Sequence, residues 1–188
     1  MAEQAKEISG GAPQDNVARS FDVQTFTARY DSIEDRICLN AVDASGGKQA
    51  IYLTRRLMDQ IIPVVAKHLE GKTPKGVPAD VVQSMTQERV RQARKAEAPP
   101  EPVQADLETP RWLCTTIQMS KQPAGLAMTL TGDAACKAQI PLADPNLRTV
   151  LDIFRNTYAK AGWDPCVFPD WLGSEQAGTG QGAQVRLN

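Results

Sequence analysis

Residues 26–53, FTARYDSIEDRICLNAVDASGGKQAIYL, have a counterpart later in the chain, residues 115–142, TTIQMSKQPAGLAMTLTGDAACKAQIPL. At a constant offset of 89 residues, and without a gap, the apolar positions of the two stretches coincide. A match of this length predicts an internal repeat. The matched pairs are Ala28 with Ile117, Tyr30 with Met119, Ile37 with Leu126, Leu39 with Met128, Ala41 with Leu130, Ile51 with Ile140, and Leu53 with Leu142.

Each stretch reads as three strands. Apolar residues alternate with polar ones, as at Ile37, Leu39 and Ala41, and this period of two is typical of strands with one buried face. The connectors at 43–47 and 121–125 contain the glycine and proline residues that tight turns require. Each stretch is therefore predicted to form a three-stranded antiparallel meander.

An amphipathic helix is predicted after the second meander. Asp144 and Pro145 suit an N-cap and the first helical position, and Gly162 suits the C-terminal end. Between them, apolar residues recur with helical spacing. They are Leu147, Leu151, Phe154 and Tyr158.

The first meander is followed by the same spacing at an offset of 90, in a helix beginning near Thr54. Pro63 lies inside it and is expected to kink, shorten or break the helix, because proline removes a backbone hydrogen bond. The predicted buried stripe is Leu57, Ile61, Val64 and His68.

The predicted fold class is α+β, with two tandem β-β-β-α repeats packed as a pseudo-twofold body. In it the two copies pair through their faces or their edges and shield each other's apolar sides. The predicted divisions are a disordered N-terminal tail (1–20), the first repeat (21–72), a connector (73–110) with an exposed helix at 79–96 and a Pro-rich linker, the second repeat with an aromatic strap (111–172), and a flexible C-terminal tail (173–188). A docking peptide at 185–187 is the alternative reading of that tail.

Composition excludes several classes of protein. The 188 residues include 21 Lys and Arg against 22 Asp and Glu, and a net charge of -1 argues against a dedicated polyanion binder. The four cysteines contain no Cys-x-x-Cys pair, which favours reduced thiols over a zinc ribbon. No long apolar run or secretion signal is visible, so we expect a cytoplasmic protein.

No motif predicts an enzyme. Gly-x-Ser-x-Gly, the phosphate-binding Gly-rich loops and metal-ligand spacings do not occur, so we expect no catalytic residue, cofactor or metal. His68, the single histidine, is expected to pack at the margin of the sheet with its nitrogen bonded. Asp31, Glu34 and Asp35 are expected to form a solvated turn. An enzyme with a cysteine or carboxylate site is the least favoured alternative.

The function that we favour is a non-enzymatic accessory or assembly subunit. It would bind another protein, or a second copy of itself, through a sheet face, a sheet edge or the 73–110 connector. The outward strand positions carry mainly uncharged residues, which suits a protein contact. Aromatic residues of the strap are the contact candidates, although such a strap more often closes a core. They are Trp163, Phe168 and Trp171.

The alternative function is single-stranded nucleic-acid binding. In topology, a duplicated sheet followed by a helix resembles the whirly-type and Pur-type single-strand-binding folds, although these use four strands per repeat and three are counted here. In this alternative Tyr52 would stack on a base while basic side chains neutralise phosphates. The basic candidates are Arg55, Arg56, Arg89, Arg91, Arg94 and Lys95.

Overall fold

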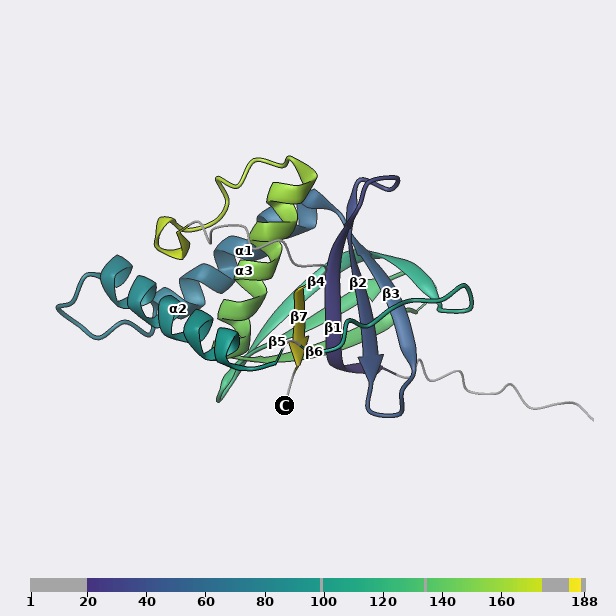
Figure 1. Ribbon diagram of the computed structural model, residues 1–188, viewed down its shortest axis with the longest axis horizontal. Helices are drawn as coiled ribbons and strands as arrows, with labels where there is room; N and C mark the ends of the chain where they lie inside the picture. Colours follow the sequence, from purple (N-terminus) through teal and green to yellow (C-terminus); the bar gives the residue numbers. More distant parts are fainter. Residues whose placement is uncertain (1–19, 99, 134, 174–182, 187–188) are drawn as a thin grey trace, which may run out of the picture.

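The computed structural model describes residues 20–98, 100–133, 135–173 and 183–186 and shows a mixed α/β protein (Figure 1). The expected N-terminal tail, 1–20, lies outside the described residues except for Ser20. The elements are β1 (Phe21–Asp31), β2 (Arg36–Asp43), β3 (Lys48–Leu53), α1 (Arg55–Glu70), α2 (Ala79–Ala96), β4 (Arg111–Gln122), β5 (Gly125–Gly132), β6 (Lys137–Ala143), α3 (Asp144–Ala161), the 3-10 turn η1 (Asp170–Leu172) and β7 (Ala183–Arg186).

Six strands close into a barrel. β1–β2–β3 and β4–β5–β6 are antiparallel meanders, as expected, and they join edge to edge. β3 pairs with β4 in parallel over three residues, and β1 pairs with β6 in parallel over two. Of the two expected modes of packing, through faces or through edges, the meanders use their edges and form one closed sheet, which leaves fewer unpaired strand edges. The structure does not confirm the expected pseudo-twofold body.

The two meanders differ in register, so the constant offset of 89 does not hold throughout. Val42 and Thr131 are 89 residues apart, but their partners Thr25 and Thr116 are 91 apart. The first hairpin turns between Asp31 and Arg36, whereas the second turns more tightly, between Gln122 and Gly125. Both β1 and β4 contain a register irregularity just before these partners. A shift of two residues leaves every side chain on its predicted face.

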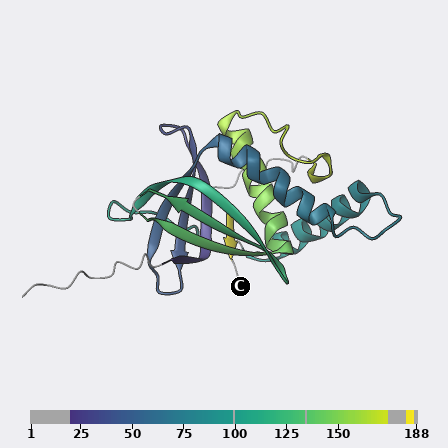
Figure 2. The same ribbon diagram turned by 180° about the vertical axis from the view of Figure 1, so that it is seen from behind.

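Helices α1 and α3 lie side by side next to the barrel (Figures 1 and 2). α3 follows the prediction closely: its four-residue stripe is buried, and Gly162 ends the helix in the left-handed conformation at φ 67°. Ala143 rather than Asp144 is the N-cap, which places Asp144 and Pro145 in the first turn. All four predicted stripe residues are less than 4% exposed.

Helix α1 begins as predicted but buries a different face. Thr54 is the N-cap, and its hydroxyl accepts a hydrogen bond from the Leu57 amide. The helix continues through Pro63 without a break, and Val64, predicted to be buried, is 46% exposed. The buried residues are Met58, Ile61, Ile62, Val65, Ala66 and Leu69.

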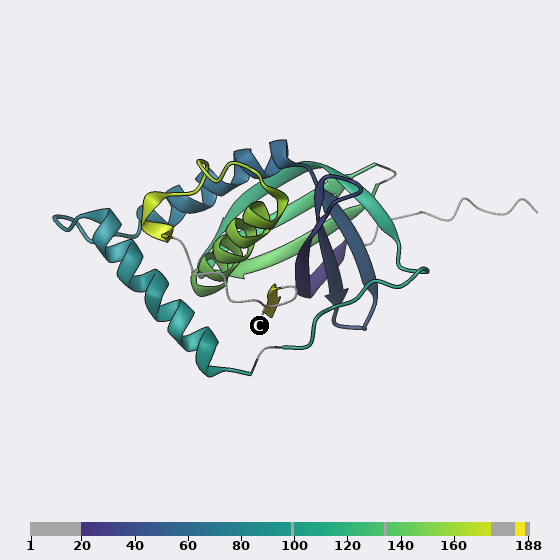
Figure 3. The same cartoon turned by 45° about the horizontal axis from the view of Figure 1, so that its top comes forward.

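The connector and the C-terminal segment both return to the barrel. After α1 the chain turns back into α2, which spans the expected residues, and an extended linker then crosses the outer face of β1–β3 before entering β4 (Figure 3). Within 173–188, the predicted flexible tail, Ala183–Arg186 pair with β1 in antiparallel orientation as β7.

The cysteines of this chain are all free thiols. Cys38 and Cys114 are buried, Cys136 is intermediate and Cys166 is exposed. Among the described helices, none is both long and apolar enough to span a bilayer.

Candidate functional site

Helix α2 is held to the body of the protein by buried polar side chains. Gln83, Gln87 and Arg91 lie on its inner face and are 2%, 0% and 9% exposed. The guanidinium of Arg91 donates to both carboxylate oxygens of Asp152 on α3, with Nη2 2.6 Å from Oδ1 and Nε 3.1 Å from Oδ2. Gln87 donates to the same carboxylate at 2.8 Å, and Arg91 also donates to the carbonyl of Leu172 at 2.6 Å. We call these residues the α2 anchor.

A second arginine extends the α2 anchor. Arg148 of α3 donates to both the side chain and the backbone carbonyl of Gln83. Its guanidinium lies 5.5 Å from the ring centre of Trp171, a cation–π distance. Gln83 in turn donates to the Leu69 carbonyl and to the Thr73 hydroxyl, at 2.9 and 2.8 Å. The inner face of α2 is therefore fixed to α1, α3 and the strap that follows α3.

The outer face of α2 is unusual for a surface helix because it carries apolar residues. Val81 and Met85 are one helical turn apart and are 48% and 58% exposed, and Val77 just before the helix is 45% exposed. A shallow open groove of about 410 Å³ lies beside Met85. Its lining residues are Ser84, Met85, Glu88, Arg89 and Gln92. We call Val77, Val81 and Met85 the α2 stripe.

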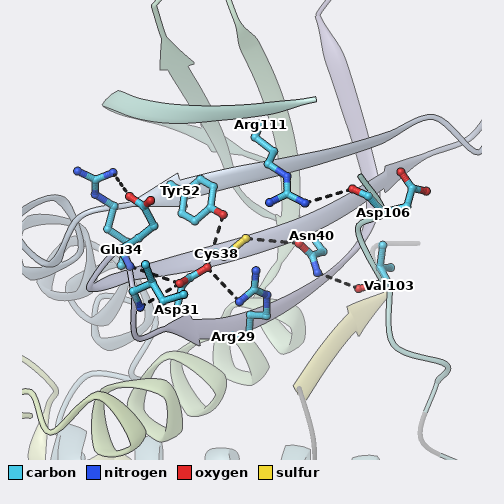
Figure 4. Close-up of polar contacts among 11 residues, drawn as sticks. Arg29, Asp31, Glu34, Cys38, Asn40, Tyr52, Val103, Asp106 and Arg111 are labelled. Atoms are coloured by element: carbon cyan, nitrogen blue, oxygen red, sulfur yellow. Dashed lines mark hydrogen bonds and ion pairs between the residues drawn. The ribbon is translucent and has the colours of Figure 1, made fainter. Parts of the chain in front are cut away.

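The outer face of the first meander is covered by the linker between α2 and β4. The amide of Val103 donates to the Thr27 hydroxyl at 2.9 Å, and Asn40 donates to the Val103 carbonyl at 3.2 Å (Figure 4). Asp106 lies 3.8 Å from Lys48 and its carbonyl accepts from Arg111. Thr27 and Asn40 are 4% and 6% exposed although they point away from the barrel interior.

Polar and aromatic side chains lie beside the linker on the same face (Figure 4). Arg29 pairs with Asp31 at 3.2 Å, and the Tyr52 hydroxyl is 3.5 Å from the same carboxylate. Burial alone would raise the pKa of Asp31, but the amides of Glu34 and Ile33 and the Arg29 guanidinium lower it on balance. Burial raises the pKa of the Tyr52 hydroxyl.

Cys38 lies in the centre of this face. Its thiol is fully buried and 3.4 Å from the Asn40 side-chain oxygen. Burial raises its pKa, because a thiolate loses more solvation than a thiol. The thiol is therefore held neutral and unreactive, and it contributes to packing beneath the linker.

The basic residues of the nucleic-acid alternative are not gathered into one patch. Arg55 and Arg56 are exposed at the start of α1, and Arg55 lies 3.5 Å from Asp59. The remaining candidates lie on α2, a separate helix that follows the turn after α1 and runs back towards the barrel (Figure 3). Among them Arg91 is committed to Asp152 in the α2 anchor. Arg89 and Lys95 are exposed, and Arg94 is intermediate.

The three aromatic contact candidates close the core. Trp163, Phe168 and Trp171 are 8%, 6% and 8% exposed. Both Trp163 and Phe168 make edge-to-face contacts with Tyr158, at 5.1 Å between ring centres. The indole N–H of Trp163 donates to Asp35 at 3.1 Å, and that of Trp171 donates to Glu70 at 2.7 Å. These rings connect the strap to the barrel and to α1.

His68 connects the end of α1 to the start of α3. Its Nε2 lies 3.1 Å from an Asp144 oxygen, and Lys72 donates to the other oxygen. Burial alone would raise the pKa of Asp144, but hydrogen bonds from Lys72 and His68 lower it on balance. The expected structural role of the single histidine therefore corresponds to an interhelical contact.

The part of the chain that the structure describes contains no group of three or more His, Cys, Asp or Glu residues able to hold a metal ion. No protein-family model, curated protein or solved structure matches this chain.

The sequence predicts an exposed helix at 79–96 but does not single out Val81 and Met85 as its exposed apolar pair. The spacing of the polar residues in the sequence indicates which face of α2 is buried. Gln83, Gln87 and Arg91 recur every four positions, a helical face that finds its partners on α3.

Proposed function

We propose that this chain is a non-enzymatic accessory protein that binds another protein through the α2 stripe. One observation carries the proposal: α2 packs on the protein through the polar side chains of Gln83, Gln87 and Arg91, while Val81 and Met85 on the same helix are about half exposed. Surface helices ordinarily do the reverse, because burial of apolar area is what holds a helix to a core. An apolar stripe that the fold itself does not use is typical of a contact surface.

The α2 anchor supports this role because it fixes the direction of the helix. A bidentate arginine–carboxylate pair is strongly directional, whereas apolar packing tolerates sliding. Gln83, Gln87 and Arg91 therefore hold Val81 and Met85 outward in one orientation. The chemistry that fits is an apolar groove on a partner protein, with polar groups at its rim that meet Glu88 and Arg89.

The proposal is tested by capture of the full-length chain from its native cells, comparing single-site variants. Val81→Glu and Met85→Glu place a charge in the contact and are expected to reduce recovery of the specific partner at least tenfold. Val64→Glu is the matched control, because Val64 is a similarly exposed valine on α1, at 46%. Equal recovery of partners by all three variants would refute the contact.

A photo-crosslinking residue gives a second readout. Installed at position 85 it is expected to form a discrete protein adduct, while the same residue at position 64 forms none. The same protein, titrated with a fluorescent single-stranded oligonucleotide at two salt concentrations, tests the nucleic-acid alternative. Tight binding that weakens steeply with salt and requires Arg55 and Arg56 would favour that function instead.

We also propose that the chain arose by duplication of a β-β-β-α unit and acts in the cytoplasm. Two features support the duplication. The β2–β3 and β5–β6 pairings have the same register at an offset of 89, and the irregularities in β1 and β4 occupy corresponding places. Cross-strand NMR contacts that give β2–β3 and β5–β6 different registers would contradict the duplication.

A further inference from the structure

Two short parallel pairings, β1–β6 and β3–β4, close the barrel, and we call them the first and the second seam. The strand edges that continue beyond the two seams differ. At the first seam β1 pairs with β6 only at Phe21 and Asp22 and then diverges from it. β7 continues the pairing on that edge of β1, opposite Thr25–Ala28 in antiparallel orientation. The backbone groups on this edge of β1 thus find partners in a separate strand.

Beyond the second seam, no described strand pairs with the corresponding edge of β4. β4 pairs with β3 only at Arg111, Trp112 and Leu113. From Thr116 onward β4 pairs with β5 on one edge, and no strand among the described residues pairs with the other. Thr116, Gln118 and Ser120 are exposed. We call the unpaired edge of residues 116–120 the β4 edge.

The strand registers show that the β4 edge corresponds to the edge of β1 with which β7 pairs. Thr25 and Thr116 each follow the irregularity in their strand, and their partners on β2 and β5 correspond at an offset of 89. Ile117 and Met119 therefore occupy the places of Phe26 and Ala28. Phe26 and Ala28 are 0% and 3% exposed, whereas Ile117 and Met119 are only partly buried. The β4 edge thus has both unpaired backbone and incompletely covered apolar side chains.

We propose that the β4 edge binds an extended segment of a partner protein, which adds to the sheet in antiparallel orientation as β7 adds to β1. The described part of each chain has two such edges and one strand, β7, to fill them, so exchange of β7 between copies leaves half of the edges unfilled. We therefore assign the segment that fills the β4 edge to a different protein as part of the proposal. Its alternate residues are apolar, because they lie opposite Ile117 and Met119.

The test uses a probe whose backbone fit is known from β7, a synthetic peptide of residues 182–188, GAQVRLN. It is added in excess to the full-length protein, and amide hydrogen exchange is measured. Amides within 116–120 are expected to exchange at least tenfold more slowly with the peptide present. Unchanged exchange would overturn the proposal, and so would a change confined to 25–28, which would mean that the peptide competes with β7 alone.

Two N-methylated peptides provide matched controls, because successive residues of a strand direct their amides to opposite edges. One is methylated at the residues of positions 183 and 185, the other at those of 184 and 186. One of them is expected to bind at least tenfold more weakly, and the other like the parent peptide. Equal binding by both, or loss in both, would overturn pairing through one backbone edge.

This inference is independent of the α2 stripe. Met85→Glu is expected to bind the peptide normally even though it loses the partner proposed for α2, so each proposal fails separately. A retained peptide signal in that variant also shows that the barrel is folded.

Discussion

The two meanders of the barrel have the same strand order and nearly the same registers, yet they are covered unequally. β1 has a strand on each side, and the outer face of its meander is covered by the linker through Val103. β4 has a strand along one side only beyond Leu113, and the outward residues Thr116 and Gln118 are exposed. Similar strand sequences thus end in one protected and one open surface.

The difference arises outside the repeated stretches. The first meander owes its cover to the linker within 73–110 and to Ala183–Arg186, and the described residues provide no counterpart of either around the second meander. Two meanders with the same strand order can therefore differ in their cover, because the covering segments lie between and after them in the chain. The open half is then the place to look for interaction with other molecules.

The largest expected loss of stability concerns α2, the helix that lies between the two meanders in the chain. Asp152→Ala removes the carboxylate that pairs with Arg91 and leaves a buried guanidinium without its counter-ion, since Asp152 is 2% exposed. Breaking a buried pair in this way costs about 3–5 kcal/mol. Chemical denaturation is expected to show that loss. Glu88→Gln, at an exposed position of α2, is the control and is expected to change stability by less than about 0.5 kcal/mol.

A second comparison, of one equally large effect with one smaller effect, tests the two meanders directly. Phe26→Ala empties a fully buried position in β1 and is expected to cost about 3–5 kcal/mol. Ile117→Ala at the corresponding position of β4 removes a partly exposed side chain and is expected to cost about 1 kcal/mol. Urea unfolding of both variants measures the difference. Equal losses would mean that the seam at β4 is as well covered as the seam at β1.

The strands and most of the core were predictable because the period of two is a local property. Ile37, Leu39 and Ala41 are buried as the alternation predicts, and the two turns lie at the expected glycines. The same period of two does not determine how β1 and β4 align with each other. Since side chains repeat their direction every second residue, an alignment of β1 with β4 at 89 or 91 gives the same inward set.

The contacts that depend on distant partners were not predictable. Val64 was assigned to the buried stripe of α1, but the helix turns Ile62 and Val65 inward because the barrel and α3 determine which face is covered. Arg91 was assigned to phosphate binding because nothing near it in the sequence shows Asp152, which is 61 residues away. Edge pairing by Ala183–Arg186 likewise depends on the gap that β6 leaves beside β1.

The smallest expected effect compares the starts of the two helices that follow the meanders. α1 begins with the uncharged cap Thr54, whereas the first turn of α3 contains Asp144, whose pKa is lowered by Lys72 and His68. A carboxylate whose pKa is lower in the folded than in the unfolded state stabilises the protein above its unfolded pKa. That contribution is lost as the pH falls through the folded pKa. Asp144→Asn is therefore expected to cost about 1 kcal/mol or less at neutral pH and to flatten the loss of stability in acid.

Thr54→Ala is the matched variant for this measurement. It removes the hydroxyl that accepts from the Leu57 amide and is expected to cost about 1 kcal/mol at every pH, because no ionisable group is changed. Thermal unfolding between neutral and acidic pH separates the two cases. The Asp144→Asn curve converges with that of the unmodified protein as the pH falls, whereas the Thr54→Ala curve stays parallel to it. Parallel curves for both variants would show that the Asp144 carboxylate contributes no charge-dependent stability at the junction of α1 and α3.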